Sequence, residues 1–157
     1  MNKARSGIAL ALTCLLALAA ACGGDPVVEA TVGGGISNQA AGAQSTIGGG
    51  ESNGAADQYD TVAGGYSQVA DGPYAFIGGG ALNTASGRMS AIGGGIYNLA
   101  SDDYATIAGG YEHRAMDRFA TVGGGGYNVV TARFGVIAGG GTEDTAYDGN
   151  VVSDEYG

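Results

Sequence analysis

Residues 91–105 read AIGGGIYNLASDDYA, and residues 106–120 read TIAGGYEHRAMDRFA. The two stretches align without a gap, with a β-branched residue at the second position, glycines at the fourth and fifth, and an aromatic residue at the fourteenth. The alignment extends in both directions to eight copies, which begin at Thr31, Thr46, Thr61, Phe76, Ala91, Thr106, Thr121 and Val136. A fixed short period repeated this often predicts a solenoid in which each copy forms one coil.

The recurring residue types predict strands and exclude helices. Two adjacent glycines in every copy would destabilise a helix by about 2 kcal/mol per repeat relative to alanine, whereas Val or Ile at the second position suits a strand. We expect two short strands per coil, over positions 14 to 3 and positions 7 to 11. Turns are expected at the glycine pair and at position 12, where Gly or Asp recurs and tolerates positive φ. The predicted fold is an all-β parallel β-roll of about eight coils, stacked about 4.8 Å apart.

Both glycines of each pair are predicted to serve the turn, because glycine allows backbone conformations and close contacts that a Cβ forbids. The predicted turn glycines are Gly34, Gly35, Gly49, Gly50, Gly64, Gly65, Gly79, Gly80, Gly94, Gly95, Gly109, Gly110, Gly124, Gly125, Gly139 and Gly140. A phosphate-binding loop would need a lysine after its glycines, and no lysine follows any of these pairs.

Alternation of side chains along a strand assigns the faces of each coil. The amide-rich eighth position and the alanine-rich tenth are predicted to point inward, as are positions 15 and 2, while the seventh and ninth face solvent. Because buried amides must be paired, the eighth position is predicted to form a hydrogen-bonded ladder. Its asparagines are Asn38, Asn53, Asn83, Asn98 and Asn128, and Gln68, His113 and Glu143 occupy the same column.

The fourteenth position carries a bulky apolar side chain in six successive copies. These residues are Tyr59, Tyr74, Met89, Tyr104, Phe119 and Phe134. We expect them to share the outer face of the first strand with the threonines of position 1, so that the chain itself leaves a long apolar stripe uncovered. A large exposed apolar patch marks an interaction surface, and the stripe therefore predicts self-association, with the same columns meeting at a symmetry axis. Arg and Asp at position 13 are expected to pair as a solvated salt-bridge ladder.

The first 21 residues have the pattern of an export signal. Lys3 and Arg5 precede an apolar run, residues 7–21, that is too short to span a membrane. The small residues before Cys22 resemble the bacterial lipobox, which implies cleavage before Cys22 and a lipid anchor on it. The alternative is an ordinary signal-peptide cleavage after Ala21, which would leave a free thiol.

The rest of the chain is predicted to contain one repeat domain. Residues 22–30 form a lipidated lead-in, residues 31–150 the eight repeats, and residues 151–157 a tail or capping turn. Val151-Val152-Ser153 resembles the start of an unfinished ninth turn. Gly23, in place of the Asp that retains lipoproteins in the inner membrane, favours an exported lipoprotein of the outer membrane or cell surface.

Composition and charge exclude several functions. The chain has 6 basic and 15 acidic residues and a net charge of −9, which argues against nucleic-acid partners and against electrostatic docking on anionic lipid. No residues suggest a catalytic triad or an acid–base pair, and the single histidine cannot form a zinc site. Asp57, Asp102 and Asp117 are interpreted as turn residues. We therefore expect no enzymatic activity, no cofactor and no metal.

Two stretches carry a family resemblance, residues 89–101 and residues 104–110. They resemble the head repeats of trimeric autotransporter adhesins of the YadA type, and the resemblance covers residues 30 to 141. It implies a left-handed parallel β-roll, a homotrimer and adhesion to an extracellular matrix or cell-surface ligand. The stalk and membrane barrel of those adhesins are not found after the repeats, and a lipid on Cys22 would replace their anchor.

Three functions follow as expectations. The first is a non-enzymatic adhesion or interaction module on the cell surface, and the second is a passive structural or coat lipoprotein without a specific ligand. The third is an ice-binding solenoid, suggested by a rank of threonines at position 1 that Phe76 and Ala91 interrupt. The rank consists of Thr31, Thr46, Thr61, Thr106 and Thr121.

Overall fold

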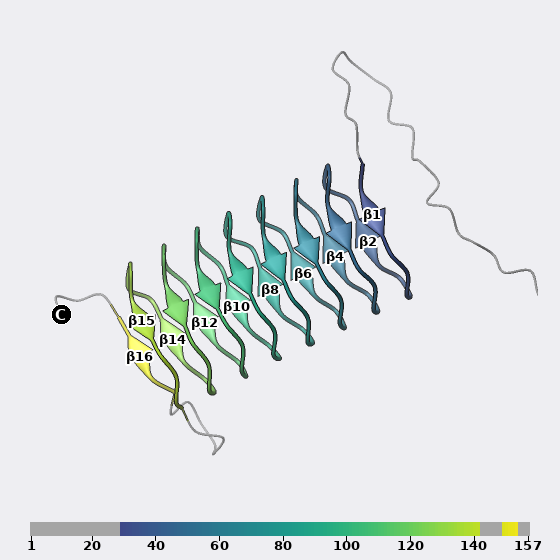
Figure 1. Cartoon of the computed structure of the whole chain (residues 1–157). Coiled ribbons are helices and arrows are strands. Elements are labelled where there is room, and N and C mark those ends of the chain that lie inside the picture. The colour runs from purple at the N-terminus through teal and green to yellow at the C-terminus, as the bar shows by residue number, and fades with distance from the viewer. Residues whose placement is uncertain (1–28, 142–148, 154–157) are drawn as a thin grey trace, which may run out of the picture.

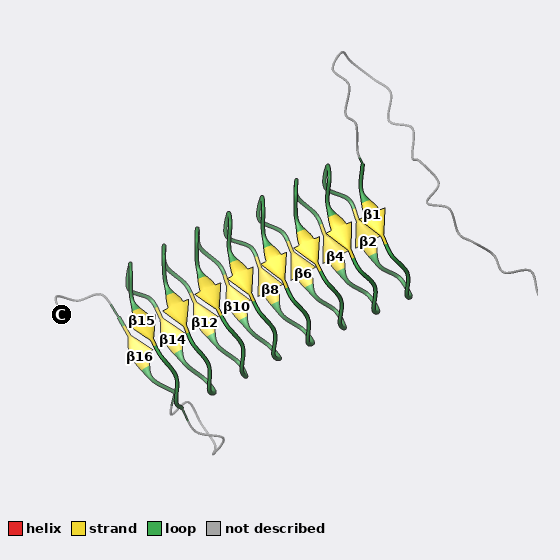
Figure 2. Ribbon diagram, in the orientation of Figure 1, coloured by secondary structure: helices red, strands yellow, loops and turns green. Residues whose placement is uncertain are grey.

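The structure is a computed structural model, and it describes residues 29–141 and 149–153. Regular structure in these residues consists of two-residue strands arranged in two eight-stranded parallel sheets (Figures 1 and 2). The first sheet contains β1 (Thr31–Val32), β3 (Thr46–Ile47), β5 (Thr61–Val62), β7 (Phe76–Ile77), β9 (Ala91–Ile92), β11 (Thr106–Ile107), β13 (Thr121–Val122) and β15 (Val136–Ile137). The second contains β2 (Gln39–Ala40), β4 (Gly54–Ala55), β6 (Val69–Ala70), β8 (Thr84–Ala85), β10 (Leu99–Ala100), β12 (Arg114–Ala115), β14 (Val129–Val130) and β16 (Val151–Val152).

Each strand pairs in parallel with the equivalent strand of the next coil. Thr31 lies beside Thr46, and Leu99 lies beside Arg114, fifteen residues apart in both cases. Figure 1 shows the coils lined up along a single axis, each with one strand in each sheet. The predicted all-β parallel solenoid with a fifteen-residue period is therefore confirmed, with about seven regular turns.

The strands are shorter than predicted, because the chain turns sharply at positions 7 and 14. Non-glycine residues at both positions adopt the left-handed conformation, as in Ser52 (φ 58°) and Tyr59 (φ 62°). Each strand is thereby confined to positions 1–2 or 9–10.

The second turn also differs from the prediction, which expected positive φ at position 12. Position 12 is instead the first residue of a tight turn, whose carbonyl accepts the N–H of position 15, as Gly72 accepts from Ala75 (2.7 Å). The Gly or Asp preference has other causes. A Cβ on Gly72 would overlap the Gly87 carbonyl of the next coil, and Asp is favoured at the first position of a turn.

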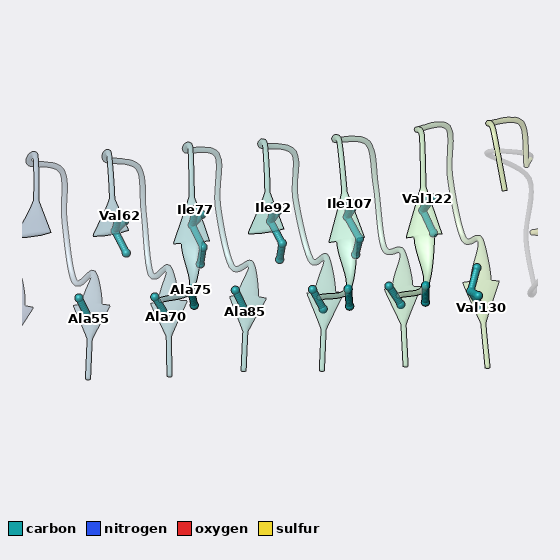
Figure 3. Packing of buried hydrophobic residues seen from close by; sticks show 14 of the residues in the cluster. Ala55, Val62, Ala70, Ala75, Ile77, Ala85, Ile92, Ile107, Val122 and Val130 are labelled. Atoms are coloured by element: carbon teal, nitrogen blue, oxygen red, sulfur yellow. The ribbon is translucent and has the colours of Figure 1, made fainter. Parts of the chain in front are cut away.

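The interior of the roll is a narrow apolar column that runs along the solenoid (Figure 3). Position 2, such as Ile92, and position 10, such as Ala100, are fully buried from the second coil to the seventh. Position 15 is buried as well and holds mainly Ser or Ala, as at Ser90 and Ala105. The predicted inward faces are confirmed, and small residues at positions 10 and 15 allow the two sheets to approach closely.

The last coil corrects the prediction for the C-terminal residues. Val151–Val152 pairs with Val129–Val130, so it is the second strand of the eighth coil and not the start of a ninth. Asn150 takes the eighth-position place predicted for Glu143, which lies outside the described residues. A carboxylate there could not donate to the glycine carbonyls, as an asparagine amide does. The chain therefore reaches the next suitable residues, Asn150 to Ser153, which repeat the N-V-V-[ST] pattern of residues 128–131.

Within the described residues no helix is long and apolar enough to cross a membrane. Cys22 and the predicted export signal lie outside the described residues.

Candidate functional site

The aromatic stripe is the column of position-14 side chains Tyr59, Tyr74, Met89, Tyr104, Phe119 and Phe134. All six lie outside the roll and are exposed or half-buried, up to 61% exposure at Phe134. All six have φ between 55° and 66°, a conformation that costs a residue with a Cβ about 1–2 kcal/mol. Glycine or asparagine would suit this backbone better, so the bulky side chains must serve something other than the turn.

The rings of the stripe stack on one another along the solenoid. Tyr59 and Tyr74 have centroids 4.8 Å apart, and Phe119 lies 4.9 Å from Tyr104 and 4.8 Å from Phe134, with interplanar angles of 13° or less throughout. Neighbouring rings cover most of the aromatic faces, so the stripe presents mainly ring edges outward. Such a surface suits lateral packing better than the stacking of a flat ligand or a sugar ring.

Arginines of position 13 reinforce the stripe instead of forming the predicted salt-bridge ladder. The guanidinium carbon of Arg118 lies 5.1 Å from the Phe119 ring centroid, and that of Arg133 lies 5.1 Å from Phe134. The Asp103 carboxylate, expected to pair with a neighbouring arginine side chain, accepts the backbone N–H of Arg88 (3.2 Å). Packing against the aromatic rings therefore replaces the expected charge pairing at these arginines.

The asparagine ladder is confirmed, and it binds adjacent coils together. The Asn98 Nδ2 donates to the Gly94 carbonyl of its own coil (3.1 Å) and to the Gly110 carbonyl of the next (3.1 Å). Its Oδ1 accepts the backbone N–H of His113 (3.0 Å). The same pattern holds at Asn38, Asn53, Asn83 and Asn128. With its donors and acceptor used in this way, the ladder is structural and offers little to a ligand.

Two members of the ladder are imperfect substitutes for asparagine. The Nε2 atoms of Gln68 and His113 are buried and make no hydrogen bond. The His113 Nδ1 accepts the Asn128 N–H (3.1 Å), so the ring proton belongs on Nε2. Burial lowers the pKa of His113, and the nearby Gly125 carbonyl offsets this only in part. In the described part of the chain no cluster of His, Cys, Asp or Glu could hold a metal ion.

Asp60 is a buried acid that the sequence analysis did not single out. It is fully buried in the position-15 column, and its carboxylate accepts the N–H groups of Asp57 (2.8 Å) and Ala75 (2.9 Å). Burial raises its pKa to about 6, against the lowering effect of these two hydrogen bonds. The visible hint is an Asp in a column otherwise made of Ser, Ala and Gly.

The two glycines of each pair are not equivalent, contrary to the prediction. Gly95 has φ +91°, and a Cβ there would overlap the Gly110 carbonyl. Gly94 lies outside the left-handed region, and the nearest atom to an added Cβ is the Gly79 carbonyl oxygen at 4.0 Å, an ordinary contact. Gly49, Gly64, Gly109 and Gly139 have the same freedom, with contacts of 3.8–4.0 Å. At these five positions the fold of a single chain does not require glycine.

The solvent-facing columns vary from coil to coil, as predicted. Position 9 changes from half-buried Leu99 to exposed Arg114 in adjacent coils. The position-1 threonines lie on the outer face of the first sheet, where Phe76, 43% exposed, interrupts them. A comparison with known proteins gives no assignment, since no protein-family model and no curated protein matches the chain.

Proposed function

We propose that the protein is a non-enzymatic adhesion or interaction module, displayed on the cell surface as a lipid-anchored trimeric β-roll. One observation carries the proposal: the interior columns hardly change over successive coils, whereas the outward columns at positions 7 and 9 vary along the roll. A uniform scaffold that presents a varied surface suits recognition.

The aromatic stripe supports the trimeric form. Exposed or half-buried apolar side chains over six successive coils form an extended surface that a soluble chain does not usually leave uncovered. The resemblance to YadA-like head repeats supports three chains and a left-handed roll. A lipid on Cys22 would hold every chain at its N-terminal end.

The anchor is tested by replacing Cys22 with Ser. The variant should leave the membrane fraction and remain exported, while the unchanged protein stays with the outer membrane. Retention of the variant in the membrane would contradict the lipoprotein assignment.

Binding is tested with the purified mature protein on immobilised matrix proteins and on intact cells. Where the wild-type protein binds, Leu99→Ser and Arg114→Glu should weaken binding without lowering the melting temperature, because both side chains lie on the outer face of the second sheet. Loss of folding would contradict the role given to these columns.

A passive coat lipoprotein is the second candidate, and the closed faces of the stacked rings favour it. A surface that presents ring edges is suited to packing against like chains. A wild-type trimer that binds none of the tested surfaces would support the coat function over adhesion.

A further inference from the structure

The position-4 glycines have a sequence pattern that the single chain does not explain. Glycine occupies this position in all eight coils, from Gly34 to Gly139, yet at none of them would a Cβ meet an atom closer than 3.8 Å. Gly34, Gly79 and Gly124 have φ of +155° to +159°, whereas the other five lie outside the positive-φ range. Positions 6 and 7, on the same turn, vary freely. A column that stays glycine where the fold does not demand it is constrained by something that approaches from outside.

The same turn carries exposed apolar side chains beside these glycines. At position 6, four of the eight coils carry a large apolar side chain: Ile36 is 66% exposed, Tyr66 49%, Ile96 42% and Tyr111 39%. The other four coils carry Glu51, Ala81, Gly126 and Gly141. We call the position-4 glycines and the four large apolar side chains of position 6 the glycine edge. The glycines would let another surface approach the backbone closely, and the apolar side chains beside them would bury area in that contact.

We propose that the aromatic stripe of one copy packs against the glycine edge of a second copy, coil against coil. This proposal rests on the self-association proposed above and names the surface that the stripe meets. It replaces the expectation that the stripe meets its own equivalent at the symmetry axis.

Periodicity identifies the partner as another copy of this chain. The glycine constraint recurs once per coil, and the rings of the stripe repeat with centroids 4.8–4.9 Å apart. A partner that imposes the same demand at every coil must share that spacing, and the stripe of a second chain does so.

The shapes of the two surfaces agree. The stripe projects ring edges and bulky side chains, and the glycine edge has bare backbone where those side chains would rest. One contact would thus account for both unexplained columns, the bulky residues in a left-handed conformation and the glycines with room for a Cβ.

A contact between two different surfaces is heterologous, so each chain uses its stripe toward one neighbour and its glycine edge toward the other. Such an arrangement closes into a ring when the rotation permits, and a trimer is one closed form. Anchors at the same end of every chain would hold the copies parallel.

Cysteine cross-linking tests which columns meet. The mature chain, produced from residue 22 onward and carrying Cys22→Ser, contains no cysteine, because Cys14 lies in the predicted leader. Phe119→Cys and Gly109→Cys place thiols in the stripe and the glycine edge of the same coil, and Gly54→Cys places one on the outer face of the second sheet. Each variant is oxidised mildly alone and in pairwise mixtures after dissociation and reassembly.

We expect a disulfide between the Phe119→Cys and Gly109→Cys chains in the mixture, and little cross-linking of either variant alone or with Gly54→Cys. Efficient cross-linking of Phe119→Cys to itself would overturn the proposal, since the stripe would then meet its own equivalent. Light scattering on the wild-type chain distinguishes failure of the proposed trimer from failure of the contact proposed here. A monomer would contradict the proposed trimer, whereas an oligomer without the mixed disulfide would contradict only the contact proposed here.

Gly94→Ala provides an independent measurement, with Gly54→Ala as its matched control, because both sites have room for a Cβ within the chain. Gly94→Ala should raise the concentration at which the oligomer dissociates by tenfold or more, and Gly54→Ala should leave it unchanged. Equal behaviour of the two variants would overturn the proposal.

Discussion

Whether the roll requires glycine at a position depends on the backbone φ there and on how close an added Cβ would come to the neighbouring coil. At Gly95 the positive φ and the Gly110 carbonyl both exclude a Cβ. We expect Gly95→Ala to destabilise the fold by about 3 kcal/mol or more, because backbone strain and steric overlap add. Gly54→Ala makes the same chemical change where there is space and should shift stability by less than about 1 kcal/mol. Urea denaturation of both variants measures the difference, and equal stabilities would contradict the assignment of Gly95.

His113 makes stability depend on pH through one side chain. Its pKa is lowered in the folded state, so below the unfolded value of 6.5 the unfolded chain takes up a proton that the folded chain resists. The stability that neutral His113 contributes is therefore present above pH 6.5 and is lost as the pH falls below it. His113→Asn should remove the dependence and add about 1 kcal/mol, because an amide can reach the glycine carbonyls. Melting temperatures at several pH values test this, and a variant less stable at pH 5 than the wild type would contradict it.

Asp60 changes the stability of the fold with pH in the opposite direction to His113. Its folded pKa of about 6 lies above the ordinary 3.8, so the folded chain holds a proton that the unfolded chain has already lost. The stability that Asp60 contributes is fully present below pH 3.8 and is lost as the pH rises through about 6. The melting temperature of Asp60→Asn, relative to wild type, should therefore increase with pH over this interval. A pH-independent difference would show that the carboxyl does not titrate in that range.

At the scale of the element, each strand depends on the ladder beside it. Asn150 donates from its backbone N–H (2.9 Å) and its Nδ2 (3.0 Å) to the Asn128 Oδ1, and these bonds hold β16 against β14. Asn150→Ala should speed hydrogen exchange at Val129 and Thr131, whose N–H groups donate to this last coil. Central coils should keep their protection, because coils interact mainly with their neighbours.

Asn98→Ala serves as the comparison for the terminal variant. The same deletion in the middle of the ladder leaves partners unpaired in coils on both sides and should lower global stability by about 2 kcal/mol. Unchanged exchange in Asn150→Ala would show that β16 is held by other contacts.

The elements also show how far the sequence could be interpreted. Alternation along a strand predicted which columns are buried, because every coil buries the same positions and therefore carries similar residues there. The left-handed residues were missed because bulky apolar side chains occupy position 14, and local preference would have put Gly or Asn there. The repeat pattern visibly decays after Gly141, but the last strand was misplaced because counting by fifteen put Glu143 in the ladder, where its charge does not fit. The unequal roles of the two glycines needed the distances between coils.

At the scale of the whole molecule, the self-association proposed for the stripe bears on whether a chain is stable alone. The interior of one coil is mostly Ala, Ser and Val or Ile, whereas each aromatic side chain of the stripe can bury about 150–250 Å² in a contact. We expect Tyr104→Ser with Phe119→Ser to dissociate the oligomer and to lower the melting temperature sharply. Wild-type melting should rise with protein concentration, as for any assembly coupled to folding.

Leu99→Ser with Arg114→Ser is the matched control, because these residues lie on the same two coils and face solvent on the second sheet. It should leave the mass in solution and the melting temperature nearly unchanged. A stable, folded monomer from the Tyr104 and Phe119 double variant would contradict a stabilising role for the stripe.

The fixed register between coils also means that the length of the roll depends directly on the number of repeats. Adding or removing fifteen residues restores every column, so the length of the protein can change in steps of about 4.8 Å while the interior stays the same. An insertion of another size shifts this register, and in the last coil the pairing resumes 22 residues after its partner, at Asn150 and Asn128. Duplication of whole repeats would therefore lengthen the roll without any change to its interior. On the lipid-anchored chain proposed above, the repeat number would set the distance of the outermost coil from the anchor.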